Sequence, residues 1–166
     1  MKTGTIIVGV IGLAAALVLW LVLDWFILSK AAPEVHLLPD GFKGPVFIAF
    51  NRLDGEQERY EDGKRVYVIP NNGILKTKFP PNDGTQHDWQ YYYQNVDGKR
   101  VAIPYVIGTD VLTKDLDRVI VFAIHTVSAP SDRTKKDMSF FTYVVGTPRE
   151  KERLIRKQQD VNLNAL

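Results

Sequence analysis

The sequence contains no cysteine, and this absence excludes several kinds of site at once. Disulfide bonds, thiolate zinc centres, iron–sulfur clusters and cysteine nucleophiles all require a thiol. A lipoprotein anchor is excluded too, because it requires an acylated cysteine. An excess of one charge sign is also missing, since 21 Lys and Arg side chains oppose 19 Asp and Glu side chains. The resulting formal charge of +2 gives no indication of a nucleic-acid partner.

Recognisable catalytic motifs are missing as well. The sequence has no Gly-x-Ser-x-Gly or Ser-x-x-Lys nucleophile motif, no glycine-rich phosphate loop and no HExxH metal helix. Its three histidines, His36, His87 and His125, have a spacing that does not pair them. We therefore expect no metal site, no cofactor and no catalytic residues. A hydrolase that uses His87 or His125 beside a carboxylate stays open as an alternative.

The most prominent feature that the sequence does contain is a hydrophobic run from Ile6 to Leu28, interrupted by one charge at Asp24. As a helix, this run is long enough to cross the ~30 Å hydrocarbon core of a membrane. We predict an N-terminal transmembrane helix, with residues 1–30 as the anchor region. A cleaved signal peptide is the alternative, but the hydrophobic region of a signal peptide usually has only about 7–15 residues.

The charges that flank the run discriminate weakly between the two orientations, because Lys2 precedes it and Lys30 follows it. A short leader followed by a long C-terminal domain is typical of single-pass signal anchors. We therefore expect the amino terminus inside and the C-terminal domain outside. This places the protein in a bacterial inner membrane, with its soluble domain on the periplasmic or extracytoplasmic side.

Residues 31–147 have the pattern of a β-sheet domain. Short runs rich in Val, Ile, Phe and Tyr alternate with turns rich in Gly, Pro, Asn and Asp. We predict an all-β fold, an antiparallel β-sandwich of seven or eight strands. The predicted strands are 45–52, 64–69, 74–79, 89–94, 100–106, 119–127 and 138–145, with a weaker one at 56–60. Residues 119–124 are apolar on both faces, so we expect them in the centre of a sheet.

Turn and capping signals mark the ends of several elements. Two Asp-Gly pairs, at residues 62–63 and 97–98, predict hairpins, because Gly adopts the positive φ of a tight primed turn. Beyond the sheet domain, Thr147 and Glu150 have the spacing of a helix capping box, with Pro148 at the first helical position. We predict a short polar C-terminal helix within residues 148–166.

The densest unusual feature of the predicted sheet is an aromatic run in the strand at residues 89–94. On a strand, Trp89, Tyr91 and Tyr93 share one face and Tyr92 lies on the other. If the first face is core, Tyr92 is a large exposed aromatic side chain, and such side chains are enriched at binding hot spots. All four are candidate partner-binding residues, with cross-strand packing as the alternative role.

A second candidate surface is the loop from Ser128 to Asp137, which carries the basic residues Arg133, Lys135 and Lys136. A hairpin tip with these side chains would present positive charge to a partner. The alternative is a solvated loop without a partner.

Two stretches of the sequence are similar to a known family. LLPDGFKGPV at residues 37–46 and YEDGKRVYVIP at residues 60–70, followed by NGILKT at residues 72–77, resemble an uncharacterised bacterial family of exported or membrane-anchored domains of unknown function. The resemblance covers residues 35–106. It implies an exported or membrane-anchored location and assigns no activity, because the matching residues contain no catalytic set.

These features together favour a membrane-anchored extracytoplasmic domain that binds another protein and is not an enzyme. The most concrete form of this hypothesis is an immunity-type inhibitor of an envelope-acting toxin, because tethering raises the inhibitor's concentration where the toxin strikes. A structural subunit of a bacterial envelope complex, whose membrane helix makes specific contacts, is one alternative. An unrecognised hydrolase is the other.

Overall fold

The structure is a computed structural model that describes residues 16–20, 30–84, 87–108, 115–129 and 138–163. The chain divides into two compact units. The first unit comprises residues 1–32 and 82–87, and the second comprises residues 33–81 and 88–166.

In the first unit, residues 16–20 are helical and exposed. Ala32 is held by the Asn82 side chain, whose oxygen accepts from the Ala32 N–H at 2.8 Å and whose nitrogen donates to the Ala32 carbonyl at 2.7 Å. The predicted membrane span of residues 6–28 lies mostly outside the described residues. In the part of the chain that the structure describes, no helix is long and apolar enough to cross a membrane.

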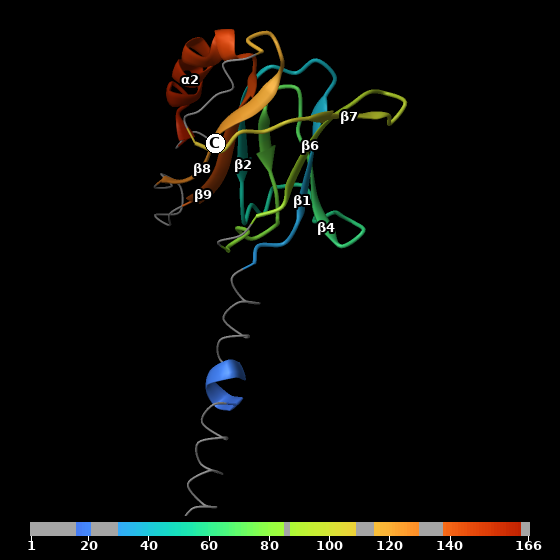
Figure 1. Cartoon of the computed structure of the whole chain (residues 1–166), viewed down its shortest axis with the longest axis vertical. Coiled ribbons are helices and arrows are strands. Elements are labelled where there is room, and N and C mark those ends of the chain that lie inside the picture. Colours follow the sequence, from blue (N-terminus) through green and yellow to red (C-terminus); the bar gives the residue numbers. More distant parts are fainter. Residues whose placement is uncertain (1–15, 21–29, 85–86, 109–114, 130–137, 164–166) are drawn as a thin grey trace, which may run out of the picture. The chain divides into compact units, whose positions relative to one another are not determined.

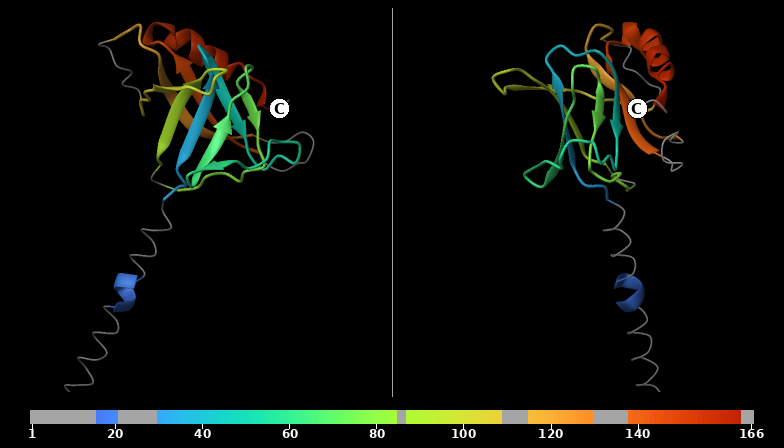
Figure 2. Two further views of the ribbon diagram at one scale, coloured as in Figure 1. Left: turned by 90° about the vertical axis from the view of Figure 1, so that its right-hand side faces the viewer. Right: turned by 180° about the vertical axis from the view of Figure 1, so that it is seen from behind.

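The second unit contains nine strands among its described residues, and they form two facing sheets (Figures 1 and 2). One sheet has the strand order β3-β4-β1-β6-β7, and the other has the order β5-β2-β9-β8. The bounds are β1 Glu34–Pro39, β2 Gly44–Ala49, β3 Tyr60–Glu61, β4 Lys64–Val68, β5 Ile74–Lys76, β6 Trp89–Gln94, β7 Arg100–Ile103, β8 Ile120–Ala129 and β9 Met138–Gly146.

The prediction of a mostly β fold is confirmed, but the prediction that its sheets are antiparallel is wrong. β1 runs parallel to both of its neighbours, β4 and β6, and β5 runs parallel to β2. The other pairings are antiparallel, so both sheets are mixed. The alternation of apolar residues specifies the buried face of a strand but not the direction of its neighbour. The prediction assumed hairpin connections where the chain crosses between sheets.

Two of the strand predictions also need correction. β1 was absent from the predicted strands, although it lies in the centre of the five-stranded sheet. Residues 119–124, expected in a sheet centre, contribute to β8, which is an edge strand. The second apolar face of β8 has another cause, because Ile120 and Phe122 pack against Leu154 of the C-terminal helix.

The predicted Asp-Gly hairpins are confirmed. Asp62 and Gly63 have φ values of 50° and 75° between β3 and β4, as a tight primed turn requires. Gly98, with a φ of 78°, lies in the turn between β6 and β7.

The core lies between the two sheets and draws its large side chains from both. The buried cluster includes Leu38, Tyr67 and Tyr91 from the five-stranded sheet and Val46 and Tyr143 from the four-stranded sheet. The opposite face of the four-stranded sheet is covered by the C-terminal helix (Figure 1).

The C-terminal helix begins at the predicted capping box. Residues Pro148–Glu150 form a 3-10 turn, and α2 follows at Lys151–Gln159. One Glu150 oxygen accepts hydrogen bonds from the Thr147 N–H at 3.2 Å and the Thr147 hydroxyl at 3.0 Å. The same oxygen lies 3.1 Å from the Lys43 ammonium of the β1–β2 turn. These contacts lower the pKa of Glu150 to about 2, with the Thr147 backbone as the largest cause and Lys43 next.

This capping contact predicts a pH dependence of stability. The Glu150 pKa is lower in the folded chain, about 2, than its ordinary value of 4.5, so the ionised form favours folding. We expect this contribution to be present above pH 4.5 and to be lost as the pH falls toward 2. Denaturant unfolding of the wild type and Glu150→Gln across this range measures it. An equal loss of unfolding free energy in both proteins between pH 4.5 and 2 would show that ionised Glu150 does not stabilise the fold.

Candidate functional site

The aromatic run of β6 divides between the two faces of its sheet as the sequence predicts. Tyr91 is buried in the core, and Trp89 packs on Phe141 with ring centroids 5.5 Å apart. Tyr93 is half-buried and donates its hydroxyl to the Phe42 carbonyl at 2.7 Å, and this burial raises its pKa to about 12. Three of the four aromatic candidates therefore face the core.

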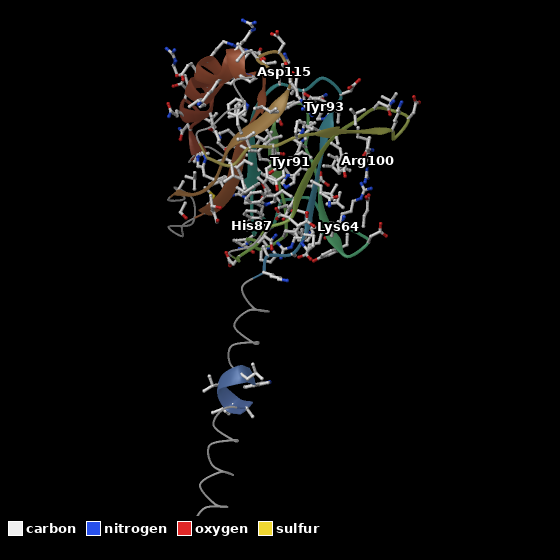
Figure 3. The ribbon with its side chains drawn as sticks, viewed as in Figure 1. Lys64, His87, Tyr91, Tyr93, Arg100 and Asp115 are labelled. Atoms are coloured by element: carbon white, nitrogen blue, oxygen red, sulfur yellow. The ribbon has the colours of Figure 1, made fainter. Side chains whose placement is uncertain are left out.

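Tyr92 lies on the outer face of the five-stranded sheet. It packs over the buried trio Val35, Leu37 and Val66, and its hydroxyl lies 3.3 Å from the Gln90 side-chain oxygen. Polar side chains extend across this outer face: Lys64 bonds to Gln90 at 3.1 Å, and Arg100 pairs with Glu61 at 2.8 Å. Figure 3 shows Lys64 and Arg100 on this side of the domain. Tyr92 thus contributes to packing, and its role in binding stays a prediction.

The basic loop candidates, Arg133, Lys135 and Lys136, lie outside the described residues. Four apolar side chains within residues 96–107 are exposed, namely Val96, Val101, Tyr105 and Ile107.

The three histidines have different surroundings. His125 is exposed and its Nδ1 lies 2.9 Å from the Ala123 carbonyl. His87 belongs to the first unit. His36 is fully buried and its Nε2 lies 3.5 Å from Glu34. Among the described residues, no group of three or more His, Asp or Glu side chains is placed to hold a metal ion.

Glu34 and His36 form a buried polar cluster that the sequence analysis missed. Both side chains point between the sheets, because residues two apart on a strand share a face. The Tyr67 hydroxyl donates to Glu34 at 3.1 Å, and the Tyr143 hydroxyl lies 3.3 Å from His36 Nδ1. Tyr91 completes the cluster, and its buried hydroxyl has no hydrogen-bond partner among the described residues.

The surroundings of this cluster oppose charge on its tyrosines. Burial raises the pKa of Tyr67, Tyr91 and Tyr143 well above the ordinary value, and the nearby Glu34 carboxylate raises each further. Glu34 and His36 are 3% and 0% exposed, so a substrate has no access to them in this conformation. The cluster is thus an element of the core and not an open catalytic site.

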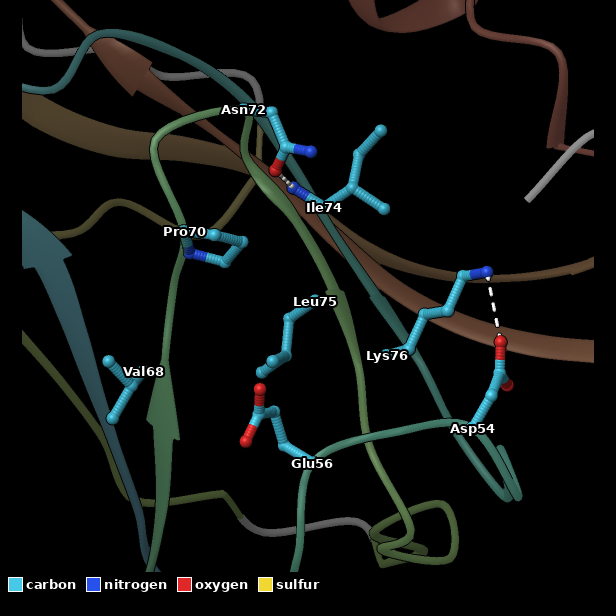
Figure 4. A pocket seen from close by; sticks show the side chains of 8 residues that line it. All are labelled: Asp54, Glu56, Val68, Pro70, Asn72, Ile74, Leu75 and Lys76. Atoms are coloured by element: carbon cyan, nitrogen blue, oxygen red, sulfur yellow. Dashed lines mark hydrogen bonds and ion pairs between the residues drawn. The ribbon is translucent and has the colours of Figure 1, made fainter.

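An open groove lies at the side of the domain where β4 and β5 diverge into different sheets (Figure 4). This β4–β5 groove has a volume of ≈ 380 Å³, within the range of about 300–1,000 Å³ that is typical of binding sites. Its apolar lining comprises Val68, Pro70, Ile74 and Leu75, and its polar lining comprises Asp54, Glu56, Asn72 and Lys76.

The charged side chains of the groove differ in their partners. Asp54 lies 3.2 Å from Lys76 and 3.3 Å from Arg52, and the hydrogen bond from Lys76 is the largest cause of its lowered pKa. The Glu56 carboxylate, in contrast, has no partner among the described residues, and Figure 4 shows it beside Leu75. Two carboxylates and one ammonium therefore leave a net negative charge in the groove lining, centred on Glu56.

Two glycines permit the main-chain path around the groove. A Cβ atom at Gly55 would lie 2.7 Å from the Thr77 nitrogen, so only glycine lets this turn approach β5. Glu56 then donates its N–H to the Lys76 carbonyl at 2.8 Å and accepts from the Lys78 N–H at 2.9 Å. At the other end, Gly73 has a φ of 76° and carries the chain from Pro70 into β5.

The fold and the groove define a two-sheet β domain with one open side and no recognised catalytic set among its described residues. The chain belongs to a family of unknown function, DUF6843, whose family model matches residues 30–148. This confirms the family membership that the sequence predicts. No curated protein matches the sequence of this chain.

A solved structure shares the fold. It is a crystal structure described as a "Putative Lipoprotein from Bacillus anthracis", with a TM-score of 0.52 and 15% sequence identity to this chain. The match covers 70% of this chain and 71% of that protein. At this identity the likeness concerns the fold alone.

The sequence held a usable signal for β1 as a strand but not for the burial of its ionisable residues or for the groove. Glu34 and His36 alternate with Val35 and Leu37, which indicates a strand with two apolar residues on one face and two ionisable residues on the other. The groove forms because β4 and β5, which are joined by a turn, belong to different sheets. The residues of that turn do not indicate which sheet the next strand enters.

The buried cluster generates a prediction about stability. Tyr91→Phe removes a buried hydroxyl that has no partner among the described residues, so we expect the free energy of unfolding to rise by about 1 kcal/mol. Tyr67→Phe is the matched control, and it should lower that free energy by about 1–3 kcal/mol because Glu34 loses a donor. Denaturant unfolding measures both. Equal losses in the two variants would contradict the assignment.

Proposed function

We propose that this chain is a membrane-tethered extracytoplasmic domain that binds another protein in the β4–β5 groove. The observation that carries the proposal is the Glu56 carboxylate, which lies beside Leu75 in an open groove and has no partner in the part of the chain that the structure describes. Binding sites in proteins are concave and place polar groups beside apolar side chains. This groove has both, with Glu56 beside Leu75.

The proposed location is supported by the fold and by the hydrophobic run. The Bacillus anthracis protein of similar fold is described as a lipoprotein, and a lipid anchor holds a domain at a membrane surface. This chain has no cysteine for such a lipid, and we propose that residues 6–28 tether it instead. Tethering confines the domain to the membrane surface and raises its effective concentration toward a partner there.

The finer form of the proposal is an immunity-type inhibitor of an envelope-acting toxin. Such an inhibitor needs a rigid binding surface and a tether but no catalytic residues. The groove supplies a surface fixed by main-chain hydrogen bonds at Glu56, and the hydrophobic run supplies the tether.

Capture of the native partner tests the proposal. Tagged full-length protein, extracted gently from its native membranes, should retain one stoichiometric partner, which mass spectrometry identifies. Glu56→Lys should lower the partner yield about tenfold, because it reverses the groove charge. The matched control is Glu152→Lys, an equal charge change on the exposed face of α2. An unchanged yield with Glu56→Lys, or no partner in any preparation, would contradict the proposal.

Exchange of the anchor separates this proposal from the structural-subunit alternative. Replacing residues 6–28 with an unrelated membrane-spanning segment should leave the partner yield unchanged, since the proposed contacts lie in the second unit. A partner lost on this exchange would favour a subunit whose membrane segment makes specific contacts.

A further inference from the structure

One wall of the β4–β5 groove is a strand edge with open main-chain groups. Gly73 and Thr77 flank β5 and both bond to β2: Thr77 donates to the Ala49 carbonyl, and Gly73 accepts from the Phe47 N–H. By alternation, Leu75 also directs its main-chain groups toward β2. The main-chain N–H and carbonyl groups of Ile74 and Lys76 therefore point away from β2, toward the groove.

Two of those four main-chain groups are already bonded. The Ile74 N–H donates to the Asn72 side chain at 3.0 Å, and the Lys76 carbonyl accepts from the Glu56 N–H at 2.8 Å. The Ile74 carbonyl and the Lys76 N–H have no partner in the described part of the chain. In a parallel sheet, these two groups bond to a single residue of the neighbouring strand, opposite Leu75. Glu56 bonds in this manner two residues further along, opposite Thr77, to the Lys76 carbonyl and the Lys78 N–H.

The other wall of the groove is the edge of β4. Ile69 donates to the Leu37 carbonyl at 2.8 Å and Val66 donates to the Arg59 carbonyl at 2.9 Å, on opposite sides of the strand. Because main-chain groups alternate along a strand, the N–H and carbonyl of Val68 point away from β1. They lie on the side of β3, but the pairing between β3 and β4 does not extend as far as Val68. Val68 is 49% exposed.

We infer that the β4–β5 groove binds an extended segment of a partner protein through main-chain hydrogen bonds to Ile74 and Lys76, with a Lys or Arg side chain of that segment against Glu56. This inference rests on the proposed function, because it assigns a binding mode to the same groove. Addition of a strand to a sheet edge is a recurrent mode of peptide recognition, in which main-chain bonds supply affinity and side-chain pockets supply specificity.

The edges of β7 and β8 are poorly suited to strand addition. β7 begins at Arg100 and is followed by Pro104, and charged residues and proline protect natural sheet edges. β8 carries a bulge between Phe122 and His125, with Ala123 at a φ of 52°. Bulges likewise oppose edge-to-edge pairing.

The charge of the groove selects the segment. Glu56 is fixed through its main chain on β5, and its carboxylate has no partner among the described residues. Asp54 is neutralised by Lys76 and Arg52. A cationic side chain gains a charge-assisted hydrogen bond at Glu56, whereas an acidic side chain meets repulsion there.

Selection from a displayed library of random decapeptides tests this inference on the full-length chain in detergent. We expect enrichment of segments in which Lys or Arg is flanked by β-branched residues. Binding of a selected peptide should weaken about tenfold in Glu56→Lys relative to Glu152→Lys. It should weaken about fivefold in Lys76→Pro relative to Lys76→Ala, because both variants lose the ammonium and only proline lacks the N–H.

Two results would overturn the inference. One is the absence of an enriched basic sequence class, and the other is equal binding to Lys76→Pro and Lys76→Ala. Proline is tolerated at an edge position whose N–H faces outward, and thermal unfolding confirms that each variant is folded. Should Lys76→Pro fail to fold, hydrogen exchange on the wild type decides, since a bound peptide must slow exchange of the Lys76 amide.

Failure of the inference is distinguishable from failure of the proposed function. If Glu56→Lys abolishes binding of the native partner and Lys76→Pro does not, the groove is still the binding site. That result rejects only binding through the main chain of β5. If binding of the selected peptides depends on the Lys76 N–H but the capture experiment finds no native partner, binding through the main chain is retained. That result rejects the proposed function.

Discussion

The close approach of Gly73 to the main chain of Pro45 is the constraint on which the open side of the domain depends. A Cβ atom at Gly73 would lie 2.4 Å from the Pro45 carbonyl oxygen, and the φ of 76° lies in the left-handed region. Glycine alone satisfies both conditions without strain. The chain can then leave β4 in one sheet and enter β5 beside β2 in the other. Because these consecutive strands diverge, their edges stay open to each other and form the groove.

At the groove, part of the main chain on the edge of β5 has no hydrogen-bond partner among the described residues. Glu56 and Asn72 each occupy one position along the edge of β5, and the Ile74 carbonyl and the Lys76 N–H lie between them. Sheet edges of this kind favour pairing with another chain unless they are covered. Arg100 and Pro104 at β7 and the bulge in β8 oppose such pairing at those two edges.

The sequence predicted local features of this fold well and long-range features poorly. The Asp62-Gly63 turn and the capping box at Thr147 and Glu150 depend on residues close in the chain, and both are present. Strand direction depends on where a connection crosses, which no local pattern encodes. β1 escaped prediction because Glu34 and His36 occupy core-facing positions that are normally apolar. Their hydrogen-bond partners in the core, Tyr67 and Tyr143, come close to them only in the folded chain.

The β4–β5 groove was not among the predicted sites, for a related reason. A sequence can indicate an aromatic side chain on the outer face of a strand, and Tyr92 was selected on that basis. Only the structure shows that Tyr92 packs over Val35, Leu37 and Val66. Nothing in the sequence singled out Glu56. Its position beside β5 depends on Gly55, whose close approach to Thr77 joins segments distant in sequence.

Site-specific photo-cross-linking in native membranes tests the central claim most directly. A benzophenone side chain placed at Val68 lies in the groove, and one placed at Val101 lies outside it, on β7. The two positions are matched in exposure, at 49% and 55%. The account predicts a cross-linked partner from Val68 and none from Val101. A partner cross-linked from Val101 alone, or from neither position, would contradict it.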